Sequence, residues 1–139
     1  MKQMRDKVFI DTNILLYLYD IDGDKKQKAK EILKSNHCIS TQVLNEFSNI
    51  SIKKIKISAE ELDINLRKII EKTTLFNFNE ETIRLAIKIQ SQYRFQYYDS
   101  LIIATALENN CNILYSEDMQ HNQKIDTLTI VNPFRNEAI

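Results

Sequence analysis

The sequence predicts an α/β fold with a parallel central sheet that is flanked by helices on both faces. Short apolar runs typical of buried strands alternate with longer amphipathic runs typical of helices, and such alternation indicates βαβ units. The 139 residues fit one ordinary domain, because a chain of this length buries about two thirds of the surface that its unfolded form exposes. We therefore expect a single domain over residues 1–139, with no linker, internal repeat or low-complexity segment.

Each expected element follows from its own residue pattern. The strands are short apolar runs, at Val8–Ile10, His37–Ser40, Thr74–Phe78, Asn112–Tyr115 and Thr127–Val131. The helices carry apolar residues three or four positions apart, at Asn13–Asp20, Lys25–Lys34, Gln42–Lys56, Ala59–Lys72, Glu80–Tyr93 and Tyr97–Leu107. Ser58 is suited to cap the fourth helix, and Ser40 or Thr41 the third. The last helix is so apolar, in YYDSLIIATAL, that we expect it to be buried on most sides.

Composition excludes several classes of protein. The 19 Lys and Arg residues balance the 19 Asp and Glu residues, so no overall field draws the chain to nucleic acid or to a membrane. A single glycine and a single proline cannot form a P-loop or a dinucleotide-binding fingerprint, both of which need several glycines. The apolar run from Val8 to Ile21 contains Asp11, Asn13 and Asp20, so we expect neither a signal peptide nor a membrane span.

The two cysteines, Cys38 and Cys111, are too few for a disulfide framework and do not have the spacing of metal ligands. We interpret both as buried thiols in a reducing compartment, and we expect the protein to be cytoplasmic.

Three aspartates are expected at one edge of the sheet. Asp11 follows the first strand, Asp118 follows the strand that ends at Tyr115, and Asp99 begins the apolar helix before that strand. Ligands of open α/β sheets bind at the carboxyl ends of the strands. Each aspartate also has a purely structural interpretation, since Asp is favoured at helix N-caps and in turns.

Glu46 needs a different explanation, because it lies more than a turn beyond the expected N-cap of its helix. It flanks the apolar stripe formed by Val43, Phe47 and Ile50. Its structural interpretation is an ion pair with a nearby Lys or Arg.

Together, four carboxylates at one edge would repel one another and raise each other's pKa values unless cations lay among them. Oxygen ligands of this kind favour Mg²⁺ or Mn²⁺, which bind through a few carboxylates together with substrate phosphate. A metal there could neutralise developing charge and activate a water molecule for attack on phosphorus. The pattern therefore indicates metal-dependent phosphoryl chemistry.

Four segments occur in order along the chain: IDTNILLY at the first strand end, NEF on an early helix, YYDSLIIATAL, and ILYSED. Together they resemble the PIN-domain nucleases, most closely the small VapC-type toxins of bacterial toxin and antitoxin pairs. The resemblance extends from Val8 to about Phe134. It implies a parallel α/β sandwich, cleavage of RNA with Mg²⁺ or Mn²⁺ to leave a 3′-hydroxyl and a 5′-phosphate, a homodimer, and inhibition by a small antitoxin protein.

The resemblance also implies roles for particular residues. The acidic catalytic and metal site falls on Asp11, Glu46, Asp99 and Asp118. Supporting roles fall on Asn13, which would orient the first acid or a water molecule, on the hydroxyl of Ser116, and on Thr12, which would support the turn. Glu117 competes with Asp118 as the fourth acid, and we favour Asp118. After it, Asn122 takes the left-handed turn position where such proteins have a residue such as glycine.

Basic and aromatic residues are less informative. Lys25, Lys26, Lys28 and Lys30 form one cluster and Lys53, Lys54 and Lys56 another, and such runs are usually solvated helix faces. Arg94 could contact substrate or pair with a site carboxylate. Tyr97 and Tyr98 could stack on bases, but aromatic residues beside a buried helix are more often core. We assign no catalytic role to His37 or His121.

Three other functional classes share parts of this pattern. A haloacid dehalogenase-type phosphatase needs a second acid two positions after Asp11, where this chain has Asn13. A receiver-like signalling domain would carry a lysine after its last strand, and TLTIV is followed by NPF. The main alternative is therefore a PIN-like module that binds RNA or a protein without cutting.

Overall fold

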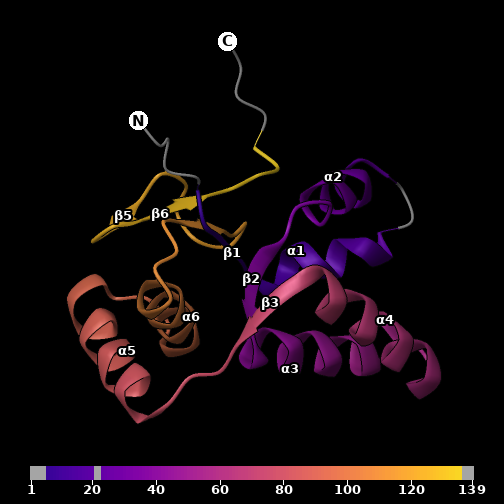
Figure 1. Cartoon of the computed structure of the whole chain (residues 1–139), viewed down its shortest axis with the longest axis horizontal. Coiled ribbons are helices and arrows are strands. Elements are labelled where there is room, and N and C mark those ends of the chain that lie inside the picture. Colours follow the sequence, from indigo (N-terminus) through magenta and orange to yellow (C-terminus); the bar gives the residue numbers. More distant parts are fainter. Residues whose placement is uncertain (1–5, 21–22, 136–139) are drawn as a thin grey trace.

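A six-stranded sheet runs through the molecule, and the computed structural model describes it over residues 6–20 and 23–135 (Figure 1). The strands are β1 (Val8–Ile10), β2 (His37–Ser40), β3 (Thr73–Phe76), β4 (Ile113–Tyr115), β5 (Lys124–Ile125) and β6 (Leu128–Val131). The domain predicted over residues 1–139 includes residues 1–5, 21–22 and 136–139, which lie outside the described residues. Ile21, the last residue of the apolar run that begins at Val8, is one of them.

The sheet is mostly parallel, in the order β3-β2-β1-β4-β6-β5, and only β5 pairs antiparallel, with β6. The parallel sheet confirms the fold class. The sequence did not indicate β5, because a two-residue strand has no detectable period. The turn before it confirms one expectation, since Asn122 adopts the left-handed conformation with φ 68°.

The helices agree with the predicted runs to within a few residues. They are α1 (Thr12–Leu16), the 3-10 turn η1 (Tyr17–Tyr19), α2 (Asp24–Ile32), α3 (Thr41–Ile50), the π-helical segment η2 (Ser51–Ile55), α4 (Ala59–Lys72), α5 (Glu80–Tyr93) and α6 (Tyr97–Glu108). The predicted helix Gln42–Lys56 therefore changes from α to π geometry after Ile50. Ser40 and Ser58 cap α3 and α4 through their side chains, as expected.

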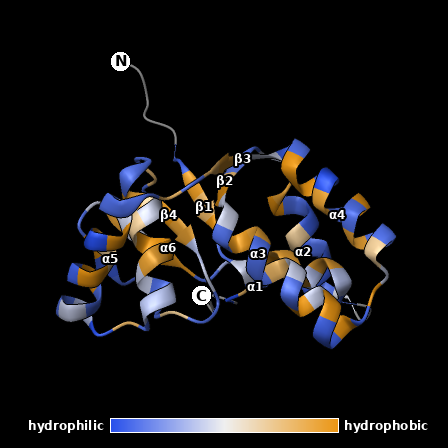
Figure 2. Cartoon of the chain, turned by 90° about the horizontal axis from the view of Figure 1, so that it is seen from below, coloured by the Kyte–Doolittle hydropathy of each residue, from blue (hydrophilic) through white to orange (hydrophobic). Residues whose placement is uncertain are grey.

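Helices cover the sheet from both sides. In Figure 1, α5 and α6 lie on one side of the strands, and α1 to α4 lie on the other. Figure 2 shows that α4 and α5 each have a hydrophobic and a hydrophilic face. By contrast, every residue of α6 from Ser100 to Ala106 is buried, which confirms that this helix is a core element.

The direction of the crossovers changes between β1 and β4. From β1 the chain moves through β2 to β3 on one side, and it then returns to form β4 on the other side of β1. Such a switch point leaves a crevice at the carboxyl ends of the two central strands, where α/β proteins bind ligands. Residues that follow β1 and β4 are therefore brought to one place.

Cys38 and Cys111 are both free and buried, as expected. The pKa of Cys38 is lowered to about 7, chiefly because its thiol forms a hydrogen bond with Cys111. Among the described residues, no helix is both long and apolar enough to cross a membrane.

Candidate active site

Asp11 stands at the switch point. Its backbone N–H donates to the Tyr115 carbonyl at 3.0 Å, which continues the pairing of β1 with β4. Its side chain caps α1, with Oδ1 accepting from the Thr12 N–H at 2.7 Å. The other oxygen, Oδ2, accepts from the Ser116 hydroxyl at 2.9 Å. The N-cap interpretation is therefore correct, and the same carboxylate also faces the loop that follows β4.

The carboxyl group of Asp11 is only 5% exposed, and its pKa is raised to about 7. Burial is the largest cause, and the charges of Asp99 and Glu46 raise the pKa further. The hydrogen bonds from Thr12 and Ser116 oppose this shift but do not cancel it. A carboxylate in these surroundings is ionised only at a free-energy cost unless a cation is present.

Glu46 is held at both carboxylate oxygens by neutral donors. The Thr12 hydroxyl donates to Oε2 at 3.0 Å, and the Gln42 side-chain amide donates to Oε1 at 3.0 Å. Within the described residues Glu46 forms no salt bridge, so the ion pair of its structural interpretation is not found there. The sequence did not single out Gln42, although its position four residues before Glu46 on one helix was a usable signal.

Asp99 is not a helix cap. The N-cap residue of α6 is Gln96, and Asp99 occupies the first turn, where it is half-buried. Its pKa is raised by burial first, and then by the charges of Asp118 and Glu46. Asp99 thus interacts with all three of the other acids, because it also contributes to the raised pKa of Asp11.

The loop after β4 separates the two candidates for the fourth acid. Asp118 is exposed and accepts a hydrogen bond from the Asn13 side-chain amide. Glu117 instead pairs with Lys25 at 2.8 Å and accepts a hydrogen bond from the Tyr17 hydroxyl. Although burial opposes it, these partners lower the pKa of Glu117. Glu117 therefore contacts Lys25 and Tyr17 instead of the other acids. Asp118 is the residue whose charge acts on Asp99.

The four acids are near enough for their charges to interact. They are too far apart for three of them to coordinate one metal ion directly. Among the residues that the structure describes, no three His, Cys, Asp or Glu side chains are close enough to hold one metal ion. The donor set nevertheless suits Mg²⁺ or Mn²⁺. It contains only oxygen ligands, and such ions keep several waters that can span the distance to a carboxylate. Burial is the main cause of the raised pKa of Asp11, and the charges of Asp99 and Glu46 add to it.

The residues around the acids differ from two expectations. Tyr97 and Tyr98 are 37% and 67% exposed, so of their two interpretations, base stacking or core, the core interpretation does not hold. They begin α6 at its solvent-facing end, which sequence periodicity could not reveal in a run this apolar. Lys25 is not simply part of a solvated face, because it pairs with Glu117 and lies 4.6 Å from the Tyr17 ring centre. Arg94 is exposed and ends α5 in a left-handed conformation.

The two histidines have structural surroundings. His37 packs edge-on against Tyr115. His121 accepts a hydrogen bond at Nδ1 from the Asn132 N–H at 3.0 Å. Neither contact brings a histidine to the four acids.

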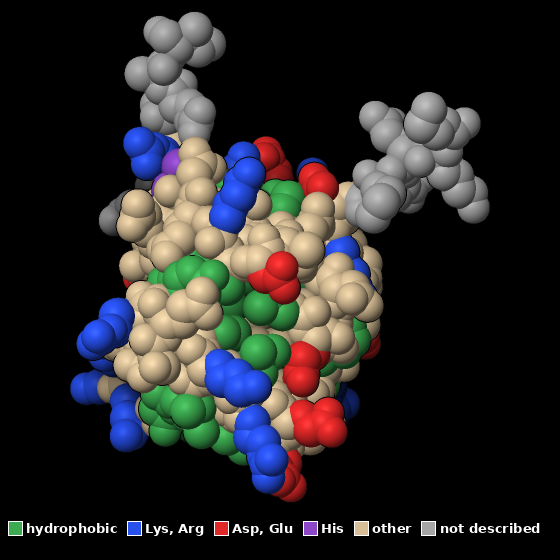
Figure 3. All heavy atoms as spheres, turned by 90° about the vertical axis from the view of Figure 1, so that its left-hand side faces the viewer, with side chains coloured by type: hydrophobic (Ala, Val, Ile, Leu, Met, Phe, Trp, Pro, Cys, Tyr) green, Lys and Arg blue, Asp and Glu red, His purple; other side chains and the backbone are tan. Residues whose placement is uncertain are grey.

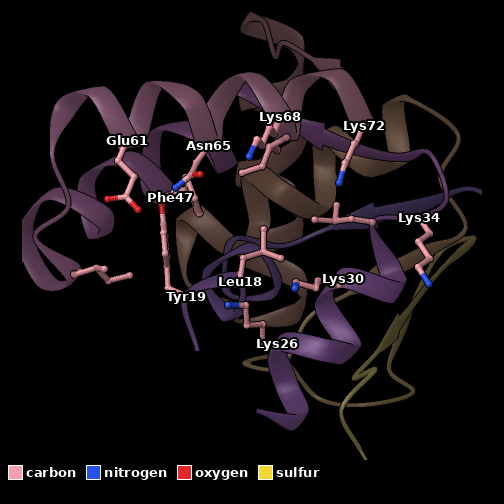
Figure 4. A pocket seen from close by; sticks show the side chains of 13 residues that line it. Leu18, Tyr19, Lys26, Lys30, Lys34, Phe47, Glu61, Asn65, Lys68 and Lys72 are labelled. Atoms are coloured by element: carbon pink, nitrogen blue, oxygen red, sulfur yellow. Dashed lines mark hydrogen bonds between the residues drawn. The ribbon is translucent and has the colours of Figure 1, made fainter. Parts of the chain in front are cut away.

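A separate groove of about 700 Å³ lies between α2 and α4 (Figure 4). Its floor includes Leu18, Phe47 and Ile69, and Tyr19 stacks on Phe47 with ring centres 5.6 Å apart. Five lysines line it, and Figure 4 shows them entering from facing helices; they are Lys26, Lys30 and Lys34 on one side and Lys68 and Lys72 on the other. The groove is thus apolar at its base, and its charged lining is mostly basic, with Glu61 as the one acidic lining residue.

Comparison with known proteins identifies the architecture. The family model of the PIN domain matches residues 8–125. A toxin–antitoxin complex from Klebsiella pneumoniae has a similar structure, with 20% identity, a TM-score of 0.71, and coverage of 94% of this chain and 100% of that chain. A comparison with curated proteins gives no match.

Two further solved structures have the same fold. VapC20 of Mycobacterium tuberculosis, a sarcin-ricin loop cleaving toxin, has 12% identity and a TM-score of 0.66, and the match covers 81% of this chain and 90% of that chain. DNA-bound VapBC of Salmonella typhimurium has 15% identity and a TM-score of 0.68, with coverage of 91% and 97%. At these identities the likeness concerns the fold.

Proposed function

Because the chain belongs to the PIN domain family, we propose that it is a metal-dependent endoribonuclease and the toxin of a toxin–antitoxin pair of the VapC type. The observation that carries this proposal is the interaction of Asp11, Glu46, Asp99 and Asp118 at the carboxyl ends of β1 and β4. Within the described residues none of the four forms a salt bridge with Lys or Arg. Such a cluster favours a bound divalent cation over a structural role.

The four acids would hold Mg²⁺ or Mn²⁺, which supplies charge neutralisation at the phosphate and lowers the pKa of water. The chain's own groups keep the acids in place. Ser116 and the Thr12 N–H fix the two oxygens of Asp11, and Asn13 holds Asp118. Glu46, with both oxygens held by neutral donors, is suited to act as a ligand or as a proton acceptor.

RNA as substrate is supported by exposed groups near Asp99. Tyr97 and Tyr98 lie beside Asp99 in the first turn of α6 and could stack on unpaired bases. Arg94, at the end of α5, could contact a phosphate. One protein of the same fold, VapC20, is described as cleaving the sarcin-ricin loop, an RNA substrate.

The test is cleavage of a mixed RNA pool by purified protein, with Mg²⁺ or Mn²⁺ and with EDTA. Asp99→Asn should abolish cleavage, because it removes the acid that interacts with the other three. The matched control is Asp63→Asn, the same change on exposed Asp63 of α4, which should cut like the wild type. Circular dichroism would establish that both variants remain folded.

The outcomes separate the proposal from its alternative. Cleavage that needs metal and is lost in Asp99→Asn supports the nuclease. Mn²⁺ binding and RNA binding without cleavage of any RNA in the pool would favour the non-cleaving binding module. Wild-type cleavage by Asp99→Asn, or full cleavage in EDTA, would refute the proposed site.

The antitoxin part of the proposal is supported by the groove between α2 and α4. An apolar floor with five lysines at its rim suits an amphipathic segment that has aliphatic residues on one face and acidic residues on the other. A synthetic helical peptide of this kind, with leucine and glutamate faces, can be tested by fluorescence anisotropy. Binding should weaken in high salt and in Lys30→Glu or Lys68→Glu, but not in Lys88→Glu on α5. Equal binding by all variants would remove this support.

We also propose that the protein is a homodimer. Figure 3 views the molecule from the side of α5, where apolar patches lie among charged side chains. Ile83 and Ile87 of α5 are 37% and 55% exposed. Sedimentation equilibrium of the wild type and of Ile87→Glu would test this, since a monomer at all concentrations would contradict the dimer.

A further inference from the structure

Gln42 is a buried polar residue that links two of the helices bearing the acids. It lies in the first turn of α3 and is 8% exposed. Its side-chain nitrogen Nε2 donates to Glu46 Oε1 at 3.0 Å, within the same helix. The same nitrogen donates to the backbone carbonyl of Tyr98 at 3.1 Å, in the first turn of α6. One amide group therefore bridges Glu46 and the residue that precedes Asp99.

The orientation of this amide is fixed by its partners. A carboxylate oxygen and a backbone carbonyl can only accept hydrogen bonds, so the nitrogen of Gln42 must face them. The carbonyl oxygen, Oε1, is then left without a donor. Among the described residues it is the one buried side-chain nitrogen or oxygen atom that has no hydrogen-bond partner.

A buried acceptor without a donor is unfavourable, and proteins tend to retain one where it serves a site. An aliphatic residue would fill the same volume in this buried first turn without leaving such an atom. Because Oε1 and Nε2 belong to one amide and are about 2.2 Å apart, Oε1 is within roughly 5 Å of the Glu46 carboxylate. The unpaired oxygen thus lies beside the acid cluster.

We propose that Gln42 is a positioning residue of the acid cluster: its side-chain amide fixes the Glu46 carboxylate relative to the start of α6. This inference rests on the proposed metal-dependent function. Gln42 and Thr12 together hold both oxygens of Glu46 in one orientation. Outer partners of this kind commonly contribute about 10-fold to 100-fold to metal affinity.

The test compares Gln42→Leu with the wild type in Mn²⁺ binding, measured by isothermal titration calorimetry on the full chain. Leucine keeps the volume but removes both the donor and the acceptor. We expect the Mn²⁺ dissociation constant to rise about 10-fold or more. The melting temperature should fall, because the Tyr98 carbonyl and Glu46 Oε1 lose the donor that Gln42 supplies. Gln42→Glu, which keeps acceptor oxygens but loses both donors, should weaken Mn²⁺ binding as well.

Thr73→Val is the matched control. It removes one buried hydrogen bond, from the Thr73 hydroxyl to the Ile69 carbonyl, at the start of β3 and away from the acids. We expect it to lower the melting temperature and leave Mn²⁺ affinity unchanged. Both variants should then be less stable than the wild type, and only Gln42→Leu should lose Mn²⁺ affinity, which separates a positioning role from a general loss of stability.

A double-mutant cycle tests whether Gln42 acts through Glu46. In a Glu46→Gln background, Gln42→Leu should change Mn²⁺ affinity less than about twofold, because the carboxylate that it orients is gone. Equal Mn²⁺ affinity of wild type and Gln42→Leu, or full additivity in the cycle, would overturn the inference while leaving the nuclease proposal intact. A wild type that binds no Mn²⁺ would overturn both.

Discussion

Replacing Asp11 by asparagine should stabilise the metal-free protein at neutral and alkaline pH. Asparagine has nearly the same shape, and it can keep both contacts. Its Oδ1 can accept from the Thr12 N–H, and its amide can donate to the Ser116 hydroxyl oxygen. The substitution therefore removes a buried negative charge and little else.

The magnitude follows from the pKa of Asp11, which is raised from 3.8 to about 7. Below the pKa of the unfolded state Asp11 is protonated in both states, so its charge does not affect the stability of the fold. The loss of stability grows between about pH 4 and pH 7 and is constant above pH 7. A difference of about 3 pKa units corresponds to about 4 kcal/mol, a large part of the stability of an ordinary domain. In a chain of this length this is a shift of roughly 10 °C in melting temperature.

The assay is urea and thermal unfolding in EDTA at pH 5, 6.5 and 8. The free energy of unfolding of Asp11→Asn should be larger than that of the wild type, and the difference should increase from pH 5 to pH 8. Asp63→Asn should show no such trend. Adding Mn²⁺ should raise the melting temperature of the wild type at pH 8 but not that of Asp11→Asn. A margin that is the same at pH 5 and pH 8, or a less stable Asp11→Asn at pH 8, would refute the reasoning.

Three smaller predictions concern other contacts. Lys25→Met should reduce the free energy of unfolding by about 1 kcal/mol or less near pH 7, and in urea titrations this loss should fade as acid protonates Glu117. Asn122→Ala should destabilise by about 1 kcal/mol in the same assay because φ is 68°, whereas Asn122→Gly should be tolerated. Cys38 and Cys111 are 4% and 1% exposed, so a thiol reagent should modify them only as fast as the protein opens, and both rapidly in denaturant.

Residue patterns predicted the parallel sheet and the acids at its edge because both depend on strand ends, which hydrophobic runs mark clearly. Asp11 and Asp118 follow β1 and β4, and these strands are adjacent in the sheet. Once that adjacency is inferred, the proximity of the two acids follows from the topology.

Side-chain contacts between segments that are distant in the chain could not be predicted from the sequence. The choice between Glu117 and Asp118 depends on Lys25 and Tyr17, roughly a hundred positions away, and no local signal reveals that pairing. The spacing of four residues could have connected Gln42 with Glu46, but nothing local indicates its second contact, with the Tyr98 carbonyl of α6. The hydrophobicity of its neighbours made a core position the more common interpretation for Tyr98, although its side chain is exposed.

The wide spacing of the four acids along the chain has a consequence for synthesis on the ribosome. Ser116 and Asp118 follow Asp11 only after more than a hundred residues. β1 also cannot pair with β4 before that point. A growing chain therefore cannot contain the four-acid cluster until Asp118 has been synthesised, and truncated products that end before β4 lack it.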